Sequence, residues 1–126
     1  MDLRSMLRRV FGRADDGAWE PGDVCSVDSG DGTFAIVKVL AFTPGMVHVR
    51  LYREHFPERP SAVSTADLSL GTVHDETFGI GHVPLTAATF RSWKPVAHGR
   101  EALDEGEEMD GFRAWQEHSG GAFGFG

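Results

Sequence analysis

The sequence has 126 residues and a mass of 13.7 kDa, which suits one globular domain. Twelve Lys and Arg against nineteen Asp and Glu give a net charge of −7, which disfavours binding to nucleic acid phosphates. No apolar run reaches the ~20 residues of a membrane-spanning helix. With Cys25 as the single cysteine, an intramolecular disulfide and a Cys-based zinc site are excluded.

The charge pattern divides the chain into four segments within one globular domain. We predict a basic amphipathic helix over residues 1–13, a linker over 14–20, a β domain over 21–98, and an acidic C-terminal helix with a Gly/Phe tail over 99–126. The first segment lacks the continuous apolar core of a secretion signal, so we expect a cytoplasmic protein.

The β domain begins with strands joined by tight turns. Strands are predicted for residues 24–28, 33–42 and 46–53, because Ser29-Gly30-Asp31-Gly32 and Thr43-Pro44-Gly45 are typical turn sequences. The second strand is apolar on both faces and is therefore expected at the centre of an antiparallel sheet.

The remaining elements are shorter. Two closely spaced prolines predict a loop over 54–61, and glycines inside an apolar stretch indicate a bulge, a barrel corner or close backbone approach. In chain order we expect a helical turn at 64–68, strands at 68–73 and 78–83, a helix at 87–93, an edge strand at 95–97 and a helix at 107–118. These elements predict a mainly β (α+β) fold, either a small, strongly bent antiparallel sheet or a partly open barrel, with short N- and C-terminal helices.

The densest polar cluster is His74-Asp75-Glu76, followed by His82. Imidazole and carboxylate groups are ligands that zinc and iron prefer, so this stretch suggests a metal-dependent hydrolase as an alternative function. The spacing matches no helix-borne zinc motif, however, and His82 suits an ordered strand histidine equally well. We therefore expect no metal or other cofactor.

Catalytic residues are not indicated elsewhere in the chain. Cys25 lies inside a predicted strand, where a free cysteine usually packs as a small hydrophobic residue. The sequence contains no nucleophile elbow, phosphate-binding loop or dinucleotide fingerprint. Binding is therefore favoured over catalysis.

A protein partner is the expected ligand. An acidic surface attracts a basic partner and speeds its encounter, and an aromatic side chain supplies affinity at its centre. The candidate partner-binding residues are Tyr52, Phe56, Asp75, Glu76, Asp104, Glu105, Glu107 and Glu108.

The stretch Gly22-Asp23-Val24-Cys25-Ser26-Val27, a Gly-Asp-Gly turn and Phe34-Ala35-Ile36-Val37-Lys38-Val39-Leu40 resemble the opening of the bacterial "immunity protein 26" family. The resemblance covers residues 21–53. It implies a small domain that binds and covers a secreted toxin, and it assigns no site residues.

Three functions follow as hypotheses. The first is an immunity protein that neutralises a basic toxin domain. The second is the metal-dependent hydrolase. The third is a membrane-surface adaptor that docks through residues 2–13, although this helix is short and membrane contact is not expected.

Overall fold

The computed structural model describes residues 19–118, so the helix expected over 1–13, most of the linker and the Gly/Phe tail lie outside the described residues. The elements are β1 (Asp23–Asp28), β2 (Phe34–Thr43), β3 (Met46–Phe56), the 3-10 turn η1 (Thr65–Asp67), β4 (Ile80–Thr86), α2 (Ala87–Ser92), β5 (Val96–Arg100) and α3 (Glu107–His118).

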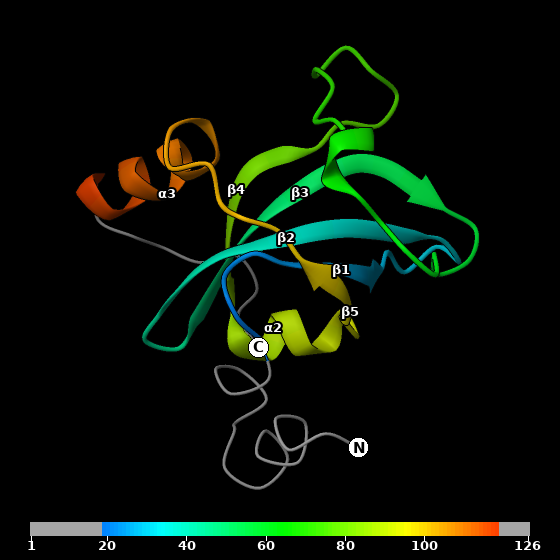
Figure 1. Cartoon of the computed structure of the whole chain (residues 1–126), viewed down its shortest axis with the longest axis horizontal. Helices are drawn as coiled ribbons and strands as arrows, with labels where there is room; N and C mark the ends of the chain where they lie inside the picture. Colours follow the sequence, from blue (N-terminus) through cyan, green and yellow to red (C-terminus); the bar gives the residue numbers. More distant parts are fainter. Residues whose placement is uncertain (1–18, 119–126) are drawn as a thin grey trace, which may run out of the picture.

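The strands form one antiparallel sheet with the order β4-β3-β2-β1-β5 (Figure 1). The sheet is open, with β4 and β5 at its edges and β2 at its centre. Register shifts in three of the four strand pairs add unpaired residues that bend the strands. The prediction of a mainly β fold built on a bent antiparallel sheet is confirmed.

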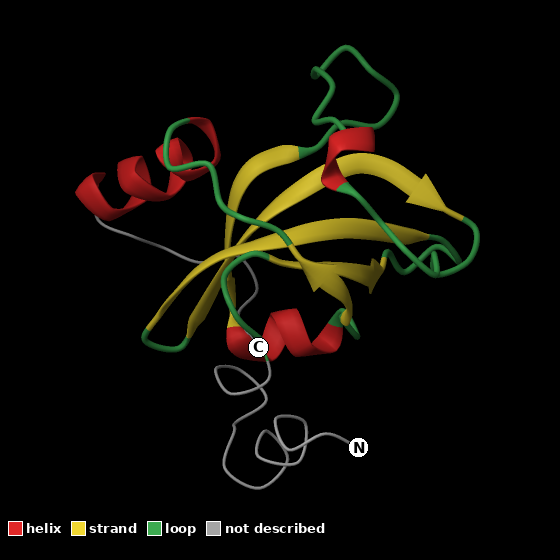
Figure 2. Cartoon of the chain, viewed as in Figure 1, coloured by secondary structure: helices red, strands yellow, loops and turns green. Residues whose placement is uncertain are grey.

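The two faces of the sheet are covered differently. Alternate side chains of β2 point to opposite faces, so Val37 joins an inner core and Leu40 an outer one. On the inner face, Phe90 of α2 is fully buried and meets Trp19 edge to face at 5.6 Å. On the outer face α3 packs over Leu40, and the two helices lie on either side of the sheet (Figure 2).

The predicted end of the third strand and the strand predicted at 68–73 are wrong, because contacts between residues far apart in the chain override the local sequence. The strand β3 continues through Glu54 to Phe56, inside the expected loop, because Phe56 pairs with Phe34 of β2. Residues 68–73 form no strand. Leu68 and Leu70 pack instead onto a buried outer-face cluster that contains Tyr52.

The fourth strand runs over residues 80–86 instead of 78–83 and passes through Pro84, which is buried opposite His48. Proline is tolerated here because β4 is an edge strand, so its nitrogen need not donate to a second neighbour. The fifth strand is also longer than predicted and extends to Arg100. The helix over 107–118 is confirmed.

Gly79 lies where two backbones approach each other, as one of the glycine interpretations predicts. A Cβ atom at this position would stand 2.2 Å from the carbonyl oxygen of Leu51, and the Gly79 amide donates to the carbonyl of Leu70 at 2.6 Å. Any Cβ atom would clash with the Leu51 carbonyl while this hydrogen bond is kept, so only glycine fits at position 79. Gly81 has no such restriction, since its nearest atoms would be 3.8 Å away.

We therefore expect Gly79→Ala to lower the free energy of unfolding by about 2–3 kcal/mol through overpacking. The matched variant Gly81→Ala should change it by less than about 1 kcal/mol. Urea denaturation of both variants measures the difference, and equal stabilities would contradict the close approach.

Candidate functional site

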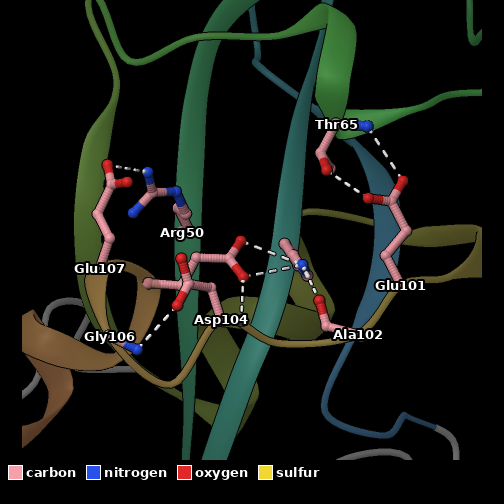
Figure 3. A network of polar contacts seen from close by, with 9 residues as sticks. Arg50, Thr65, Glu101, Ala102, Asp104, Gly106 and Glu107 are labelled. Carbon is pink, nitrogen blue, oxygen red and sulfur yellow. Dashed lines mark hydrogen bonds and ion pairs between the residues drawn. The ribbon is translucent and has the colours of Figure 1, made fainter.

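The outer face of the sheet carries a buried lysine. Lys38 of β2 exposes 3% of its side chain, and its ammonium group donates to both carboxylate oxygens of Glu108 at 3.1 Å and to the carbonyl of Ala102 at 2.7 Å. These bonds compensate the ammonium group for the water it loses. They also attach the start of α3 to the central strand (Figure 3).

The segment before α3 is ordered by further polar contacts. Glu108 accepts from the amide of Asp104 at 2.7 Å, and Asp104 accepts from the amide of Gly106 at 2.8 Å. Glu107 turns the other way: it is 77% exposed and reaches Arg50 at 3.4 Å (Figure 3). The predicted acidic surface is therefore divided, with Glu108 turned inward and Glu107 outward.

Glu101 links this segment to the loop that follows β3. Its carboxylate accepts from the amide of Thr65 at 3.0 Å and from the Thr65 hydroxyl (Figure 3). Burial acts to raise the pKa of Glu101, but the bonds from Thr65 and the charge of Lys38 outweigh it, and the pKa is lowered. The carboxylate thus stays ionised and holds η1 against the outer face.

Removing the charge of Glu108 should be costly. We expect Glu108→Gln to destabilise the protein by about 3 kcal/mol, because it leaves the ammonium of Lys38 buried without a counter-charge. The neighbouring variant Glu107→Gln removes an exposed, long ion pair and should cost less than about 1 kcal/mol. Chemical denaturation at neutral pH compares the two, and equal losses would contradict this assignment.

A pair of stacked histidines lies beneath α3. The rings of His48 and His82 are nearly parallel with centroids 5.1 Å apart, and Nδ1 of His48 is 2.9 Å from Nε2 of His82. The other ring nitrogen of His48 bonds the Thr43 hydroxyl at 2.7 Å. Phe112 and Trp115 cover both rings edge-on. This pair is part of the packing between α3 and the sheet.

The environment disfavours protonation of both rings. Burial, followed by the charge of His82, lowers the pKa of His48 to about 4, and burial also lowers the pKa of His82. The folded protein therefore holds both rings neutral at neutral pH, whereas an unfolded histidine takes up a proton near pH 6.5.

Stability should fall as the pH drops from about 6.5 towards 4, because the unfolded chain then binds protons that the folded chain excludes. From His48 alone we expect a loss of about 2–3 kcal/mol. Denaturant titrations across this pH range measure the loss of stability. The variant His74→Gln, at an exposed site, is the control and should show the same dependence of stability on pH. A flat profile from pH 7 to about 4 would contradict the buried neutral pair.

The proposed metal ligands are not gathered at one place. His82 stacks on His48 under α3, whereas His74 and Glu76 lie exposed in the loop between η1 and β4. Asp75 contacts Arg53 at 3.3 Å and caps the amide of Thr72 at 2.6 Å. Within residues 19–118 no three His, Cys, Asp or Glu side chains form a group that could hold a metal ion.

The predicted aromatic contacts are made within the protein itself. Tyr52 is buried in the outer-face cluster with Val24 and Ile36, and Phe56 packs against the same cluster. Cys25 is fully buried in the inner core, and burial, followed by the charge of Asp23, raises the pKa of its thiol to about 12. Its thiol is therefore inert at neutral pH, and Cys25 packs as a small hydrophobic residue.

A second polar cluster lies around Ser26, and no local sequence pattern indicates it. Its hydroxyl is 2.8 Å from Nε2 of His98 and accepts from Arg59 at 2.9 Å. A serine beside an imidazole can be a nucleophile, but Ser26 is fully buried and Arg59 also binds its carbonyl oxygen. The cluster therefore joins β1, β5 and the loop after β3.

Exposed apolar side chains gather at the loop before β4. Val73 is 73% exposed, Phe78 48% and Ile80 43%. Ile80 pairs with Leu51 of β3, so its side chain lies towards the inner face, whereas Glu107 contacts Arg50 on the outer face. We call Val73, Glu76, Phe78 and Ile80 the Phe78 surface.

Comparison with known proteins identifies no relative: the chain matches no protein-family model, no curated protein and no solved structure. Among the described residues, the helices are too short or too polar to cross a membrane.

Proposed function

We propose that this chain is a protein-binding module that uses the Phe78 surface to cover a basic partner, as an immunity protein covers its toxin. The observation that carries the proposal is the exposure of three large apolar side chains in and next to the loop that holds the exposed carboxylate of Glu76. Neighbouring apolar side chains of this kind mark interaction sites on soluble proteins. Carboxylates at the rim then favour a partner of opposite charge.

The distribution of ion pairs supports this choice of surface. Lys38 takes up the charge of Glu108, and Arg53 offsets that of Asp75. By contrast, Glu76 is exposed in the loop before β4. This carboxylate can therefore steer a basic partner, with Phe78 as the apolar contact at the centre.

The experiment begins with affinity capture from bacterial extract on the tagged full chain. A specific partner should be retained by wild type and by Val96→Ser, and lost with Phe78→Ser. Val96 is a suitable control because it is 43% exposed on β5, at the opposite edge of the sheet. The purified partner must then bind with at least about tenfold lower affinity to Phe78→Ser.

Charge and neutralisation are tested with the same purified partner. Glu76→Lys should slow association in a salt-dependent manner, whereas Glu58→Lys, at an exposed site in another loop, should have a smaller effect. Equimolar chain should abolish the partner's toxicity in a growth assay. A partner that Phe78→Ser still binds with full affinity would refute the surface, and one that binds but stays toxic would refute the immunity role.

A further inference from the structure

The inner face of the sheet is incompletely covered at the end of α2, where a pocket of about 280 Å³ lies. Val27 and Ala35 of its lining belong to the inner core, and Leu51 and Trp93 pack against that core. Phe90 of α2 is fully buried, whereas Trp93, just beyond the helix, is only partly buried. The pocket is therefore an opening in the cover of an apolar core, and an apolar group that fills it is stabilised by its burial.

The described part of the chain begins on this same face. Trp19 packs against the inner core and meets Phe90 edge to face at 5.6 Å, beside α2 (Figure 1). Its indole Nε1 is buried and has no hydrogen-bond partner among residues 19–118. Because buried donors in proteins are nearly always paired, a segment that brings an acceptor to Trp19 is favoured. The residue that joins residues 1–18 to the fold thus lies on the side of the sheet that carries the pocket.

The sequence of the N-terminal segment suits an apolar site. Five apolar side chains recur with the period of a helix, which places them on one side of it: Leu3, Met6, Leu7, Val10 and Phe11. We call these five side chains the apolar stripe. Residues 1–13 also carry four arginines and one aspartate, whereas residues 19–118 carry eight basic and sixteen acidic side chains. The opposite net charges favour a position of this segment close to the rest of the chain.

The connection from Trp19 to the pocket is long enough for this segment to enter it. Trp93 lies three residues after Phe90, which is about 4.5 Å along the helix axis. Residues 12–18 join Phe11 to Trp19 and span up to about 25 Å when they are extended. Phe11 can therefore reach the pocket while Trp19 keeps its contact with Phe90.

From these observations we propose that residues 3–11 form an amphipathic helix that docks in the pocket through Leu7 and Phe11, which lie one turn apart. The two side chains pack against Leu51 and the core side chains beside it, and the segment completes the cover of the inner core. The volume is near the lower end of the range for ligand sites, about 300–1,000 Å³, and suits one or two side chains.

The C-terminal tail is a poorer occupant of this pocket. Phe123 and Phe125 follow α3, which packs on the outer face, and residues 119–126 contain no charged side chain. The Phe78 surface is a separate feature, because none of the residues that line the pocket belongs to it. The docking of residues 3–11 is therefore independent of the proposed function.

The test is NMR on the full chain with a nitroxide spin label at Ser5→Cys, a position opposite the apolar stripe. Cys25 is fully buried and its thiol has a pKa of about 12, so only the introduced cysteine takes up the label. The amide signal of Phe112, on the outer face, should be retained. The amide signals of the pocket lining should lose most of their intensity, and those to follow are Val27, Ala35, Leu51 and Trp93.

Two variants of the spin-labelled chain show whether the apolar stripe holds the segment in place. Leu7→Ser/Phe11→Ser should restore the signals of the pocket lining, because it removes the two side chains that dock. Arg8→Lys/Arg9→Lys is the matched control. It keeps the charge and the apolar stripe, so the loss of signal at the pocket should remain as it is without these substitutions.

Three results would overturn the proposal. Signal loss that is absent at the pocket, or equal on both faces of the sheet, would show that residues 3–11 do not dock there. Signal loss that persists in Leu7→Ser/Phe11→Ser would show that the apolar stripe does not hold the segment. Signal loss of the same extent in isotope-labelled wild type, when it is mixed with the spin-labelled chain, would assign the docked segment to a second copy.

Discussion

The outer face of this protein depends on one requirement: the ammonium of Lys38, buried on the central strand, must have partners. Glu108 and the carbonyl of Ala102 provide them, and both belong to the segment that enters α3. Because these bonds fix where the helix begins, they also help to bring Phe112 and Trp115 over the ring of His48. One charge on β2 thus orders an element more than sixty residues away along the chain.

The same requirement decides how the negative charge is used. A carboxylate that neutralises a buried ammonium has lost its hydration and its freedom to meet a partner. Glu108 is in this position, whereas its neighbour Glu107 remains in water. Net charge therefore overstates the charge available for recognition. What matters is which carboxylates lie beside exposed apolar side chains, and the loop before β4 is one place where the two occur together.

Groups with catalytic potential are used here for packing. The thiol of Cys25 and the hydroxyl of Ser26 are fully buried, and the stacked histidines lie beneath aromatic rings. A nucleophile or base must reach a substrate, so burial of this kind favours a structural role for each group. Three accessible large apolar side chains lie instead in and next to the loop before β4, the surface for which we propose a partner.

The sequence by itself determined the first three strands, their turns and the final helix, because alternation, glycine turns and helical periodicity are local properties. It also indicated a special role for Gly79. Only the tertiary structure decided that residues 68–73 cover a core instead of forming a strand, that Lys38 pairs with Glu108, and that the amide of Asp28 donates to the carbonyl of Trp93. These outcomes depend on residues far apart in the chain, whose meeting is set by sheet order and burial and not by any local pattern.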